Sequence, residues 1–422
     1  MALIGEITIP ADKSISHRSL IFSALTKSKV KIKNLSLGED CLSTLEILKK
    51  LGVEYQFLSE HDLISDSSKG LTYNNHIVFD CGNSGTTTRL LSGLFASLVG
   101  LDCELQGDES LSKRPMKRII EPLSLMGADI KSSDNKLPLY IKGKTLNPVT
   151  YFSPVASAQV KSCLILAGLN TKGKTRVYEK ILSRNHSEIM LEYLGASIST
   201  GQDEKGFFVE VEKSDIVARD IEITGDISSA AFFMVAAAIV PNSSVLIKNV
   251  GINPTRAGII DVFKEAQIDF ELENIRKVTN ELTADIRVNY TCEIKPFKIS
   301  GDLIPRLIDE IPILAVLMAC ADGKSTVSDA SDLRNKESDR IKTLVDTFNL
   351  LEIPIKENPD GFEIVGGCEI NKEVTLETHL DHRLAMSYYV LSLINKSKTN
   401  ILGFECVNTS FPEFKEFMEK LK

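Results

Sequence analysis

The sequence predicts an α/β protein in which one βα module is repeated six times and grouped as two lobes of three. Three observations support this fold class. Short polar openings recur along the chain at intervals of about 70 to 80 residues, which is longer than the usual solenoid repeat. Each opening precedes a segment that is apolar on nearly every side, which is typical of a buried helix. A turn of small residues and a β-branched strand then follow.

The six polar openings are expected to lie at the N-termini of the core helices. In chain order they are D-K-S-I-S-H-R (12–18), G-N-S-G-T-T-T-R (82–89), S-A-Q-V-K (157–161), G-D-I-S-S-A (225–230), I-D-E-I-P (308–312) and D-H-R-L-A-M (381–386). Helix N-termini carry unpaired N–H groups and a partial positive charge, so these openings favour bound anions.

A second, more amphipathic helix completes the modules. In the first three modules it ends at a glycine C-cap, in L-K-K-L-G-V (48–53), L-S-L-M-G-A (123–128) and L-E-Y-L-G-A (191–196). We expect hinges near residues 9–11 and 224–226. One lobe would then be 12–225 and the second lobe 1–11 with 226–422, with the active site in the cleft between them.

Size and composition narrow the functional classes. The chain has 422 residues, of which 43% are hydrophobic and 25% are charged, a composition typical of globular proteins with sizeable cores. The net charge of −8 argues against general nucleic-acid binding, so basic clusters are expected to be local pockets for small anions. The apolar stretch 230–240 is too short to cross a bilayer, and no membrane association is expected.

We expect a cytoplasmic protein without a metal site. The start, M-A-L-I-G-E-I-T-I-P, has neither the basic region nor the cleavage site of a secretion signal. The 8 cysteines contain no C-x-x-C pair, which favours reduced thiols over disulfides or zinc ligands. The 6 histidines form no H-x-x-x-H or H-E-x-x-H pattern.

The segment L-R-N-K-E-S-D-R (333–340) carries the strongest local signal. It is expected to be a turn that runs into a helix, with Lys336 and Arg340 on one face. Two like charges at this spacing repel, so a bound anion explains them unless Asp332 or Asp339 neutralises the pair. Glu337 could move a proton beside that anion. The alternative is a solvated charged turn.

Other openings offer donors of the same kind. In the first, Ser14 and Arg18 share a face next to Lys13, although capping by Ser14 or Ser16 is an equal alternative. The glycine-rich opening 82–89 resembles a phosphate cradle, in which Gly82 and Gly85 allow close backbone approach and Arg89 follows; the alternative is a glycine turn with a threonine cap.

A basic loop, S-L-S-K-R-P-M-K-R (110–118), places Arg114 beside a rigid proline, or it is simply a solvated loop. Asp309 and Glu310 lie at the start of an apolar run, where burial could shift their pKa or where they could stabilise a helix dipole. Together these segments predict a cleft for small, multiply charged anions with a proton donor and acceptor at hand.

These motifs, with S-K-R-P-M and D-E-I-P, resemble in order the signatures of the 5-enolpyruvylshikimate-3-phosphate (EPSP) synthase family, the 3-phosphoshikimate 1-carboxyvinyltransferases. The resemblance covers essentially the whole chain. It implies a two-lobed inverse α/β prism, each lobe built of three βαβαββ units, with the lobe 12–225 on the shikimate 3-phosphate side. It also implies transfer of the enolpyruvyl group of phosphoenolpyruvate to the 5-hydroxyl of shikimate 3-phosphate, on the shikimate pathway to chorismate and aromatic amino acids. No cofactor and a monomeric chain are expected.

The resemblance also implies roles for individual residues. Asp309, Glu337 and Lys13 would be catalytic: Asp309 takes the 5-hydroxyl proton, Glu337 protonates the methylene carbon, and Lys13 touches both substrates. The residues expected to bind shikimate 3-phosphate are Lys13, Ser14, Arg18, Ser157, Ala158, Gln159, Arg184, Asp309 and Lys336. Those expected to bind phosphoenolpyruvate are Lys13, Gly85, Arg114, Gln159, Arg340 and Arg383.

Two positions depart from the family pattern. Thr409 and Ser410 stand before the final F-P pair, where many members carry a lysine, and Ala158 replaces a serine found in part of the family. Two rival functions remain. A UDP-sugar enolpyruvyl transferase usually has a K-N motif and a cysteine in the basic loop, whereas here Ser14 follows Lys13 and 110–118 contains no cysteine. The other rival is a non-catalytic prism protein that only binds anions.

Overall fold

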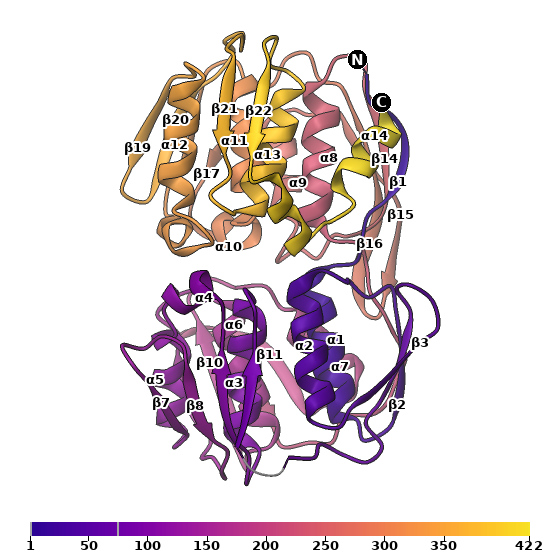
Figure 1. The fold of residues 1–422 in the computed structure, drawn as a ribbon, viewed down its shortest axis with the longest axis vertical. Helices are drawn as coiled ribbons and strands as arrows, with labels where there is room; N and C mark the ends of the chain where they lie inside the picture. The colour runs from indigo at the N-terminus through magenta and orange to yellow at the C-terminus, as the bar shows by residue number, and fades with distance from the viewer. Residues whose placement is uncertain (1, 74–75) are drawn as a thin grey trace. The chain divides into compact units, whose positions relative to one another are not determined.

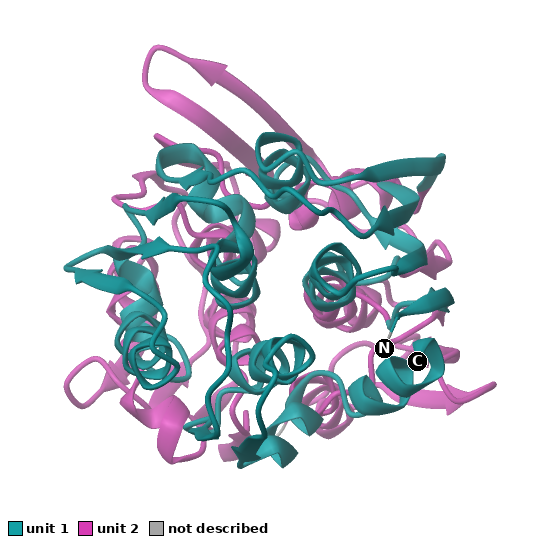
Figure 2. Ribbon diagram, turned by 90° about the horizontal axis from the view of Figure 1, so that it is seen from above, with its two compact units in different colours: residues 1–10, 224–277, 282–422 teal, residues 11–223, 278–281 magenta. Residues whose placement is uncertain are grey.

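The computed structural model describes residues 2–73 and 76–422, which form two compact units. Unit 1 comprises Met1–Pro10, Thr224–Lys277 and Leu282–Lys422, and unit 2 comprises Ala11–Ile223 with Val278–Glu281. Figure 1 labels the elements and Figure 2 colours the units. Met1, which the sequence analysis assigns to the second lobe, lies outside the described residues.

Unit 2 contains three four-stranded sheets, ordered β13-β2-β4-β3, β5-β6-β8-β7 and β9-β10-β12-β11 in the described part of the chain. In each sheet the first pair is parallel and the other two pairs are antiparallel. The strands are β2 (Lys29–Lys33), β3 (Glu54–Phe57), β4 (Leu63–Asp66), β5 (His76–Asp80), β6 (Asp102–Gln106), β7 (Asp129–Ser132), β8 (Leu139–Lys142), β9 (Thr150–Phe152), β10 (Lys174–Glu179), β11 (Ile198–Asp203), β12 (Gly206–Glu212) and β13 (Ile221–Glu222). The helices are α1 (Lys13–Leu25), α2 (Glu39–Lys50), α3 (Gly85–Ser97), α4 (Glu109–Lys113), α5 (Lys117–Leu125), α6 (Ala158–Leu169) and α7 (His186–Tyr193).

Unit 1 repeats the pattern in the sheets β1-β14-β16-β15 and β17-β18-β20-β19, while β21 and β22 form a parallel pair. The strands are β1 (Ile4–Thr8), β14 (Ser244–Gly251), β15 (Phe270–Val278), β16 (Glu281–Asn289), β17 (Lys298–Ile299), β18 (Lys324–Val327), β19 (Ile355–Asn358), β20 (Gly361–Val365), β21 (Val374–Glu377) and β22 (Thr399–Leu402). The α-helices are α8 (Ile227–Ile239), α9 (Gly258–Glu265), α10 (Ile304–Leu307), α11 (Ile311–Cys320), α12 (Arg340–Leu350), α13 (His382–Ser392) and α14 (Phe414–Leu421). Short 3-10 helices span Gly301–Leu303, Ser331–Asn335 and Phe404–Thr409.

The core helices begin at the six polar openings, which confirms that part of the sequence analysis. In unit 2 they are α1, α3 and α6, and in unit 1 they are α8, α11 and α13; most of their residues are buried. Helices α3 and α6 pack directly on one another. A Cβ atom at Gly93 would lie 2.0 Å from the Cys163 carbonyl oxygen, so only glycine permits this packing distance.

The side chains that cap these helices differ from the alternatives considered above. Asp12, not Ser14 or Ser16, caps α1 by accepting a hydrogen bond from the Ile15 amide at 2.8 Å. Ser84, not a threonine, caps α3 through the Thr87 amide at 3.1 Å. Since Asp12 satisfies the Ile15 amide, the hydroxyl of Ser14 is not required as the cap of α1.

The chain passes between the units again at the turn of the β15–β16 hairpin. Residues 278–281 belong to unit 2, whereas the two strands that lead to them pair within the unit 1 sheet. Thr279 Oγ1 accepts a hydrogen bond from the Glu222 amide and donates one to the Glu222 carbonyl, both at 2.9 Å.

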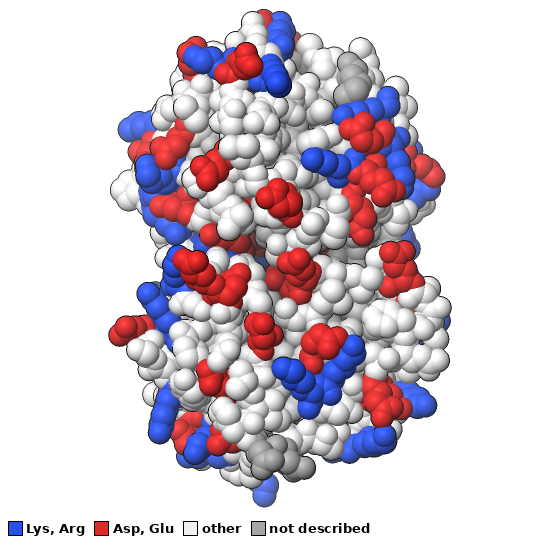
Figure 3. All heavy atoms as spheres, viewed as in Figure 1, with Lys and Arg blue, Asp and Glu red and all other residues white. Residues whose placement is uncertain are grey.

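Three further features concern the surface charges, the cysteines and the lengths of the helices. On the face drawn in Figure 3, Lys and Arg side chains are interspersed with Asp and Glu, and no broad basic area is visible there. All 8 cysteines are free thiols. Within residues 2–73 and 76–422, no helix is long and apolar enough to cross a membrane.

Candidate active site

The predicted site residues fall into two groups, one in each unit, and their chemistry differs. The unit 2 group contributes the cations Lys13, Arg18, Arg114 and Arg184 together with neutral residues. Both predicted catalytic carboxylates, Asp309 and Glu337, belong to unit 1. The unit 2 group therefore offers cationic and neutral donors suited to an anion, and the unit 1 group adds the two carboxylates.

Helix α1 presents Lys13, Ser14 and Arg18 within its first turns. Lys13 Nζ forms an ion pair with Asp40 at the start of α2. Arg18 is buried and donates from Nη1 to the Ser14 carbonyl at 2.9 Å. These bonds hold both cations in defined positions at the N-terminus of α1.

The start of α3 and the basic loop meet at Gly85. Arg114 donates to Asn83 Oδ1 at 2.7 Å, and its Nη1 lies 3.7 Å from where a Gly85 Cβ would stand. Arg89 Nη1 would be closer still to that Cβ, at 2.7 Å. Gly85 therefore leaves the space into which two guanidinium groups reach, as a phosphate cradle requires.

Arg89, which the sequence analysis placed in the cradle motif but did not list as a ligand, lies beside two predicted ligands. Its Nη1 donates to Gln159 Oε1 at 2.7 Å, and Gln159 Nε2 donates to Thr86 Oγ1 at 3.0 Å. Arg89 thus joins the predicted ligands Gly85 and Gln159. The available signal was its spacing, one helical turn after Gly85, which places both on the same face of α3.

The N-terminus of α6 provides Ser157, Ala158 and Gln159. Ser157 is the N-cap and accepts a hydrogen bond from the Val160 amide at 3.4 Å, while Ala158 is the first helical residue. Any polar contact from Ala158 must come from its backbone. Arg184 lies in the loop between β10 and α7, immediately before the α7 N-cap, Asn185.

In unit 1, three predicted cations gather around Asp309. Its Oδ1 atom lies 3.2 Å from Lys336 Nζ and 3.7 Å from Arg340 Nη1. Arg383 Nη1 donates to the Asp309 carbonyl at 3.3 Å. The Asp309 side chain retains 16% exposure, so it remains accessible to a ligand.

Glu337 joins the same network through Arg340, whose Nη2 lies 2.8 Å from Glu337 Oε2. Arg340 is itself held by Asp381, which is fully buried. Burial alone would raise the pKa of Asp381, but the Arg340 guanidinium outweighs burial and holds that pKa below its ordinary value. Asp381 is thus a buried counter-charge that fixes Arg340 next to Asp309 and Glu337.

One detail of the sequence analysis is wrong. Lys336 and Arg340 do not share a helix face, because α12 begins at Arg340 and Lys336 has extended backbone angles, φ −85 and ψ −157. Asp339 caps α12 through the Lys342 amide at 3.0 Å. The two cations converge by reaching Asp309 from different local structures, and not by helical spacing.

Glu310 has a structural environment distinct from that of its neighbour. It is buried, accepts a hydrogen bond from Ser228 Oγ, and lies 4.0 Å from Arg383 Nη1. Ser228 also accepts from Arg256 Nη2 at 3.0 Å. The Glu310 carboxylate therefore lies next to Arg383, whereas the Asp309 carboxylate lies next to Lys336.

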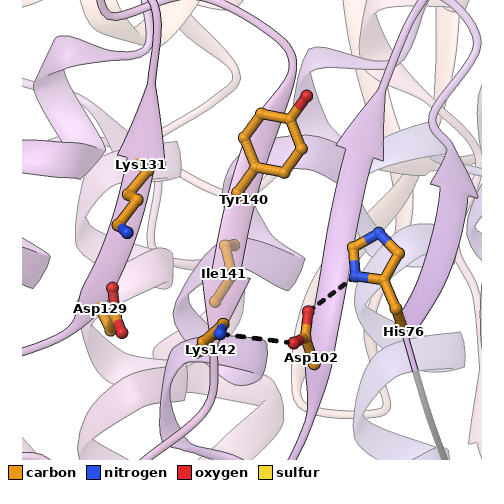
Figure 4. Close-up of a pocket in the computed structure, with 7 residues that line it drawn as sticks. All are labelled: His76, Asp102, Asp129, Lys131, Tyr140, Ile141 and Lys142. Carbon is orange, nitrogen blue, oxygen red and sulfur yellow. Dashed lines mark hydrogen bonds and ion pairs between the residues drawn. The ribbon is translucent and has the colours of Figure 1, made fainter.

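Figure 4 shows a pocket on the β5-β6-β8-β7 sheet that contains none of these residues. Asp102 is one of its lining residues and lies 2.7 Å from His76 Nδ1 and 3.7 Å from Lys142 Nζ. In the described residues, no group of three or more His, Cys, Asp and Glu side chains is arranged to hold a metal ion.

Thr409 and Ser410, which stand where many family members carry a lysine, end the last 3-10 helix, and both are half-buried.

Comparison with known proteins completes this description. A sequence profile described as EPSP synthase (3-phosphoshikimate 1-carboxyvinyltransferase) matches residues 1–418. The chain is 44% identical to the 3-phosphoshikimate 1-carboxyvinyltransferase of Petrotoga mobilis over 99% of this chain and 97% of that protein. It is also 44% identical to the enzyme of the same name from Staphylococcus haemolyticus, over 98% of this chain and 95% of that protein.

Solved structures agree. An EPSP synthase from Acinetobacter baumannii superposes with a TM-score of 0.87 at 37% identity, covering 100% of this chain and 96% of that chain. The enolpyruvyl transferase NikO from Streptomyces tendae, at 15% identity and a TM-score of 0.78, shares the fold over 100% of this chain and 95% of its own. The predicted inverse α/β prism is thereby confirmed, and the chain belongs to the EPSP synthase (3-phosphoshikimate 1-carboxyvinyltransferase) family.

Proposed function

We propose that this protein transfers the enolpyruvyl group of phosphoenolpyruvate to the 5-hydroxyl of shikimate 3-phosphate and releases inorganic phosphate. Family membership supports this acceptor over a UDP-sugar. The observation that carries the proposal is the unit 1 network, in which Arg340 links Asp309 to Glu337. It supplies one carboxylate for each of the two proton transfers that the reaction needs.

The chemistry balances without a redox step. Asp309 accepts the 5-hydroxyl proton as the oxygen attacks C2 of phosphoenolpyruvate, and Glu337 donates a proton to the methylene carbon. In the tetrahedral adduct, the C2–O bond to phosphate breaks and a methyl proton returns to Glu337, which restores the carbon–carbon double bond. The hydroxyl proton leaves with inorganic phosphate, so each carboxylate ends the cycle in its starting state.

The proposed ligands form one set for each substrate. Gly85, Arg114, Gln159, Arg340 and Arg383 are proposed to bind phosphoenolpyruvate, with Lys13 touching both substrates. Ser14, Arg18, Ser157, Ala158, Gln159, Arg184, Asp309 and Lys336 are proposed to bind shikimate 3-phosphate. Fixed guanidinium groups then stabilise the charge that moves to the leaving phosphate.

Phosphate release tests the proposal. The purified protein is incubated with each substrate alone, with both together, and with both after treatment with a metal chelator. We expect release only when both are present and no loss after chelation, since carboxylates and arginines suffice for the proposed chemistry. Release from phosphoenolpyruvate alone, or none with both substrates, would overturn it.

The non-catalytic alternative is tested by Glu337→Gln, which keeps the shape of the side chain but removes the acid. The transferase is expected to lose about 100-fold or more in kcat, while a protein that only binds anions would keep its affinity for shikimate 3-phosphate and have no turnover to lose.

We further propose that the protein is cytoplasmic and that it acts as a monomer. All proposed ligands come from one chain, so the proposed site needs no second copy. Light scattering of the purified protein measures its molecular mass.

A further inference from the structure

Lys161 lies on the buried face of α6 and carries a charge that the proposed reaction does not use. Its side chain is 2% exposed. Its Nζ lies 2.9 Å from Glu179 at the end of β10 and 2.8 Å from Glu188 in the first turn of α7. Burial alone would lower the pKa of Lys161, but Glu188 and Glu179 outweigh it and the pKa is raised. Lys161 therefore stays charged and stays paired.

The same ammonium group fixes the backbone next to Arg184. Lys161 Nζ donates to the Ser183 carbonyl at 3.2 Å. That carbonyl belongs to the peptide that joins Ser183 to Arg184, so the bond sets the orientation of this peptide plane. Glu179 holds the same residue from its other side, accepting from Ser183 Oγ at 2.6 Å and from the Ser183 amide at 3.2 Å.

The next residue of α6, Ser162, binds Arg18, another residue proposed to bind shikimate 3-phosphate. Ser162 Oγ accepts from Arg18 Nη2 at 2.8 Å and lies 2.7 Å from Ser187 Oγ, which accepts from Arg18 Nε at 2.7 Å. Adjacent positions of α6 thus hold Arg18 and the Arg184 loop. The N-terminus of the same helix presents Ser157 and Gln159.

Stability alone is a weak explanation for this buried cluster. Desolvation of three charges is costly, and apolar side chains of similar volume are often as stabilising. A lysine that bonds a loop carbonyl and two loop-flanking carboxylates instead provides a defined geometry. The structural consequence is a fixed distance between the start of α6 and the loop that carries Arg184.

We propose that Lys161, through Glu179 and Glu188, is a positioning residue that aligns Arg184 with the 3-phosphate of the acceptor substrate. This inference rests on the proposed function for the identity of that substrate. Because only 2% of the Lys161 side chain is exposed, its effect on the substrate is exerted through Arg184 and not by direct contact. It should therefore govern affinity for the phosphorylated acceptor and preference for it over unphosphorylated shikimate.

Steady-state kinetics of Lys161→Met tests the proposal. We expect the KM for shikimate 3-phosphate to rise about 10- to 100-fold, because misplacement by a fraction of an ångström to an ångström has effects of this order. The KM for phosphoenolpyruvate should remain within about twofold. The preference for shikimate 3-phosphate over shikimate should fall in parallel, and Lys161→Arg should restore part of it.

The chain offers a matched control in Lys174. It also lies between two glutamates, 2.9 Å from Glu210 and 3.4 Å from Glu212, but its side chain is 61% exposed. Lys174→Met should leave both KM values unchanged. Where Lys161→Met fails to fold, Ser183→Ala removes only the bond from Ser183 Oγ to Glu179 and should raise the same KM by a smaller factor.

A double-mutant cycle with Arg184→Ala separates positioning from general structural damage. If Lys161 acts through Arg184, Lys161→Met should add little to the loss caused by Arg184→Ala. Additive losses, or equal losses for shikimate 3-phosphate and shikimate, would overturn the inference.

Calorimetric titration with shikimate 3-phosphate distinguishes failure of the inference from failure of the proposed function. A wild-type protein that binds this compound without turnover would contradict the transferase, and the weaker binding expected for Lys161→Met would still support the inference. A wild-type protein that does not bind it would overturn both.

Discussion

Arg340 and Asp381 form a buried two-point ion pair, with Nε 2.8 Å from Oδ2 and Nη2 3.2 Å from Oδ1. Arg340 also lies 2.8 Å from Glu337 and 3.7 Å from Asp309, so one guanidinium group contacts both proposed catalytic carboxylates. Asp381 additionally caps α13 through the Arg383 amide at 3.0 Å. A single buried carboxylate therefore holds two of the proposed phosphoenolpyruvate ligands.

Asp381→Asn should weaken both folding and phosphoenolpyruvate binding. It leaves the Arg340 guanidinium buried without the carboxylate that binds it at two points, which is expected to cost about 3 kcal/mol of unfolding free energy. The KM for phosphoenolpyruvate should rise more than the KM for shikimate 3-phosphate. Denaturant unfolding and steady-state kinetics measure the two effects, and Asp346→Asn, at an exposed ion pair with Lys342, is the control. Unchanged stability would contradict the assigned role of Asp381.

His17 should make the protein less stable in mild acid. It is buried on α1, its Nδ1 lies 2.7 Å from Thr44 Oγ1, and burial together with Lys13 and Arg18 holds its pKa well below 6.5. Between that lowered value and 6.5, the unfolded chain binds a proton that the folded chain does not. Stability is therefore complete above 6.5 and is lost as the pH falls, by up to about 1.4 kcal/mol per pH unit.

Unfolding by denaturant at pH 7.5, 6.5 and 5.5 measures this slope. His17→Asn, which removes the titrating group, should have a shallower slope than the wild-type protein over this range. His379→Asn, at an exposed position, should retain the wild-type slope. Parallel slopes for wild type and His17→Asn would show that another group is responsible.

Gly85→Ala should weaken phosphoenolpyruvate binding. The added methyl group would stand 2.7 Å from Arg89 Nη1, so the guanidinium must move and its bond to Gln159 is strained. We expect the KM for phosphoenolpyruvate to rise about tenfold, with little change in the melting temperature because Arg89 is the side chain that yields. A melting temperature that falls while this KM stays constant would contradict the cradle role of Gly85.

Asp309→Asn should lower kcat by about 100- to 10,000-fold, because it removes the general base. Both KM values should change much less, since the amide keeps the shape of the side chain. Asp261→Asn, which alters an exposed ion pair with Arg306, provides the comparison. Retention of kcat to within about twofold would assign the base to another residue.

The repeat and the helix starts could be predicted because they depend on local pattern. All-round apolar segments after a polar opening form buried helices in any globular setting, and α1, α3, α6, α8, α11 and α13 begin where this pattern begins. The segment 333–340 shows the limit of the same reasoning. Its charges obey helical spacing, yet Asp339 caps α12 and leaves Lys336 outside the helix.

The ion-pair partners could not be predicted, because they are distant in sequence. Asp381 is 41 residues from Arg340, and no spacing rule connects them. Lys161 was visible only as the end of the S-A-Q-V-K opening, and nothing local indicated that its charge is buried between Glu179 and Glu188. Arg89, by contrast, was visible in the cradle motif, and its place one turn from Gly85 could have added it to the predicted ligands.

Phosphorus NMR of one reaction mixture, with phosphoenolpyruvate and shikimate 3-phosphate in equal amounts, tests the central claim most directly. Enolpyruvyl transfer predicts that inorganic phosphate appears as the phosphoenolpyruvate signal disappears, while the 3-phosphate signal moves to a new product position without loss of intensity. Inorganic phosphate formed from phosphoenolpyruvate with the 3-phosphate signal unmoved would mean hydrolysis and would contradict the transferase.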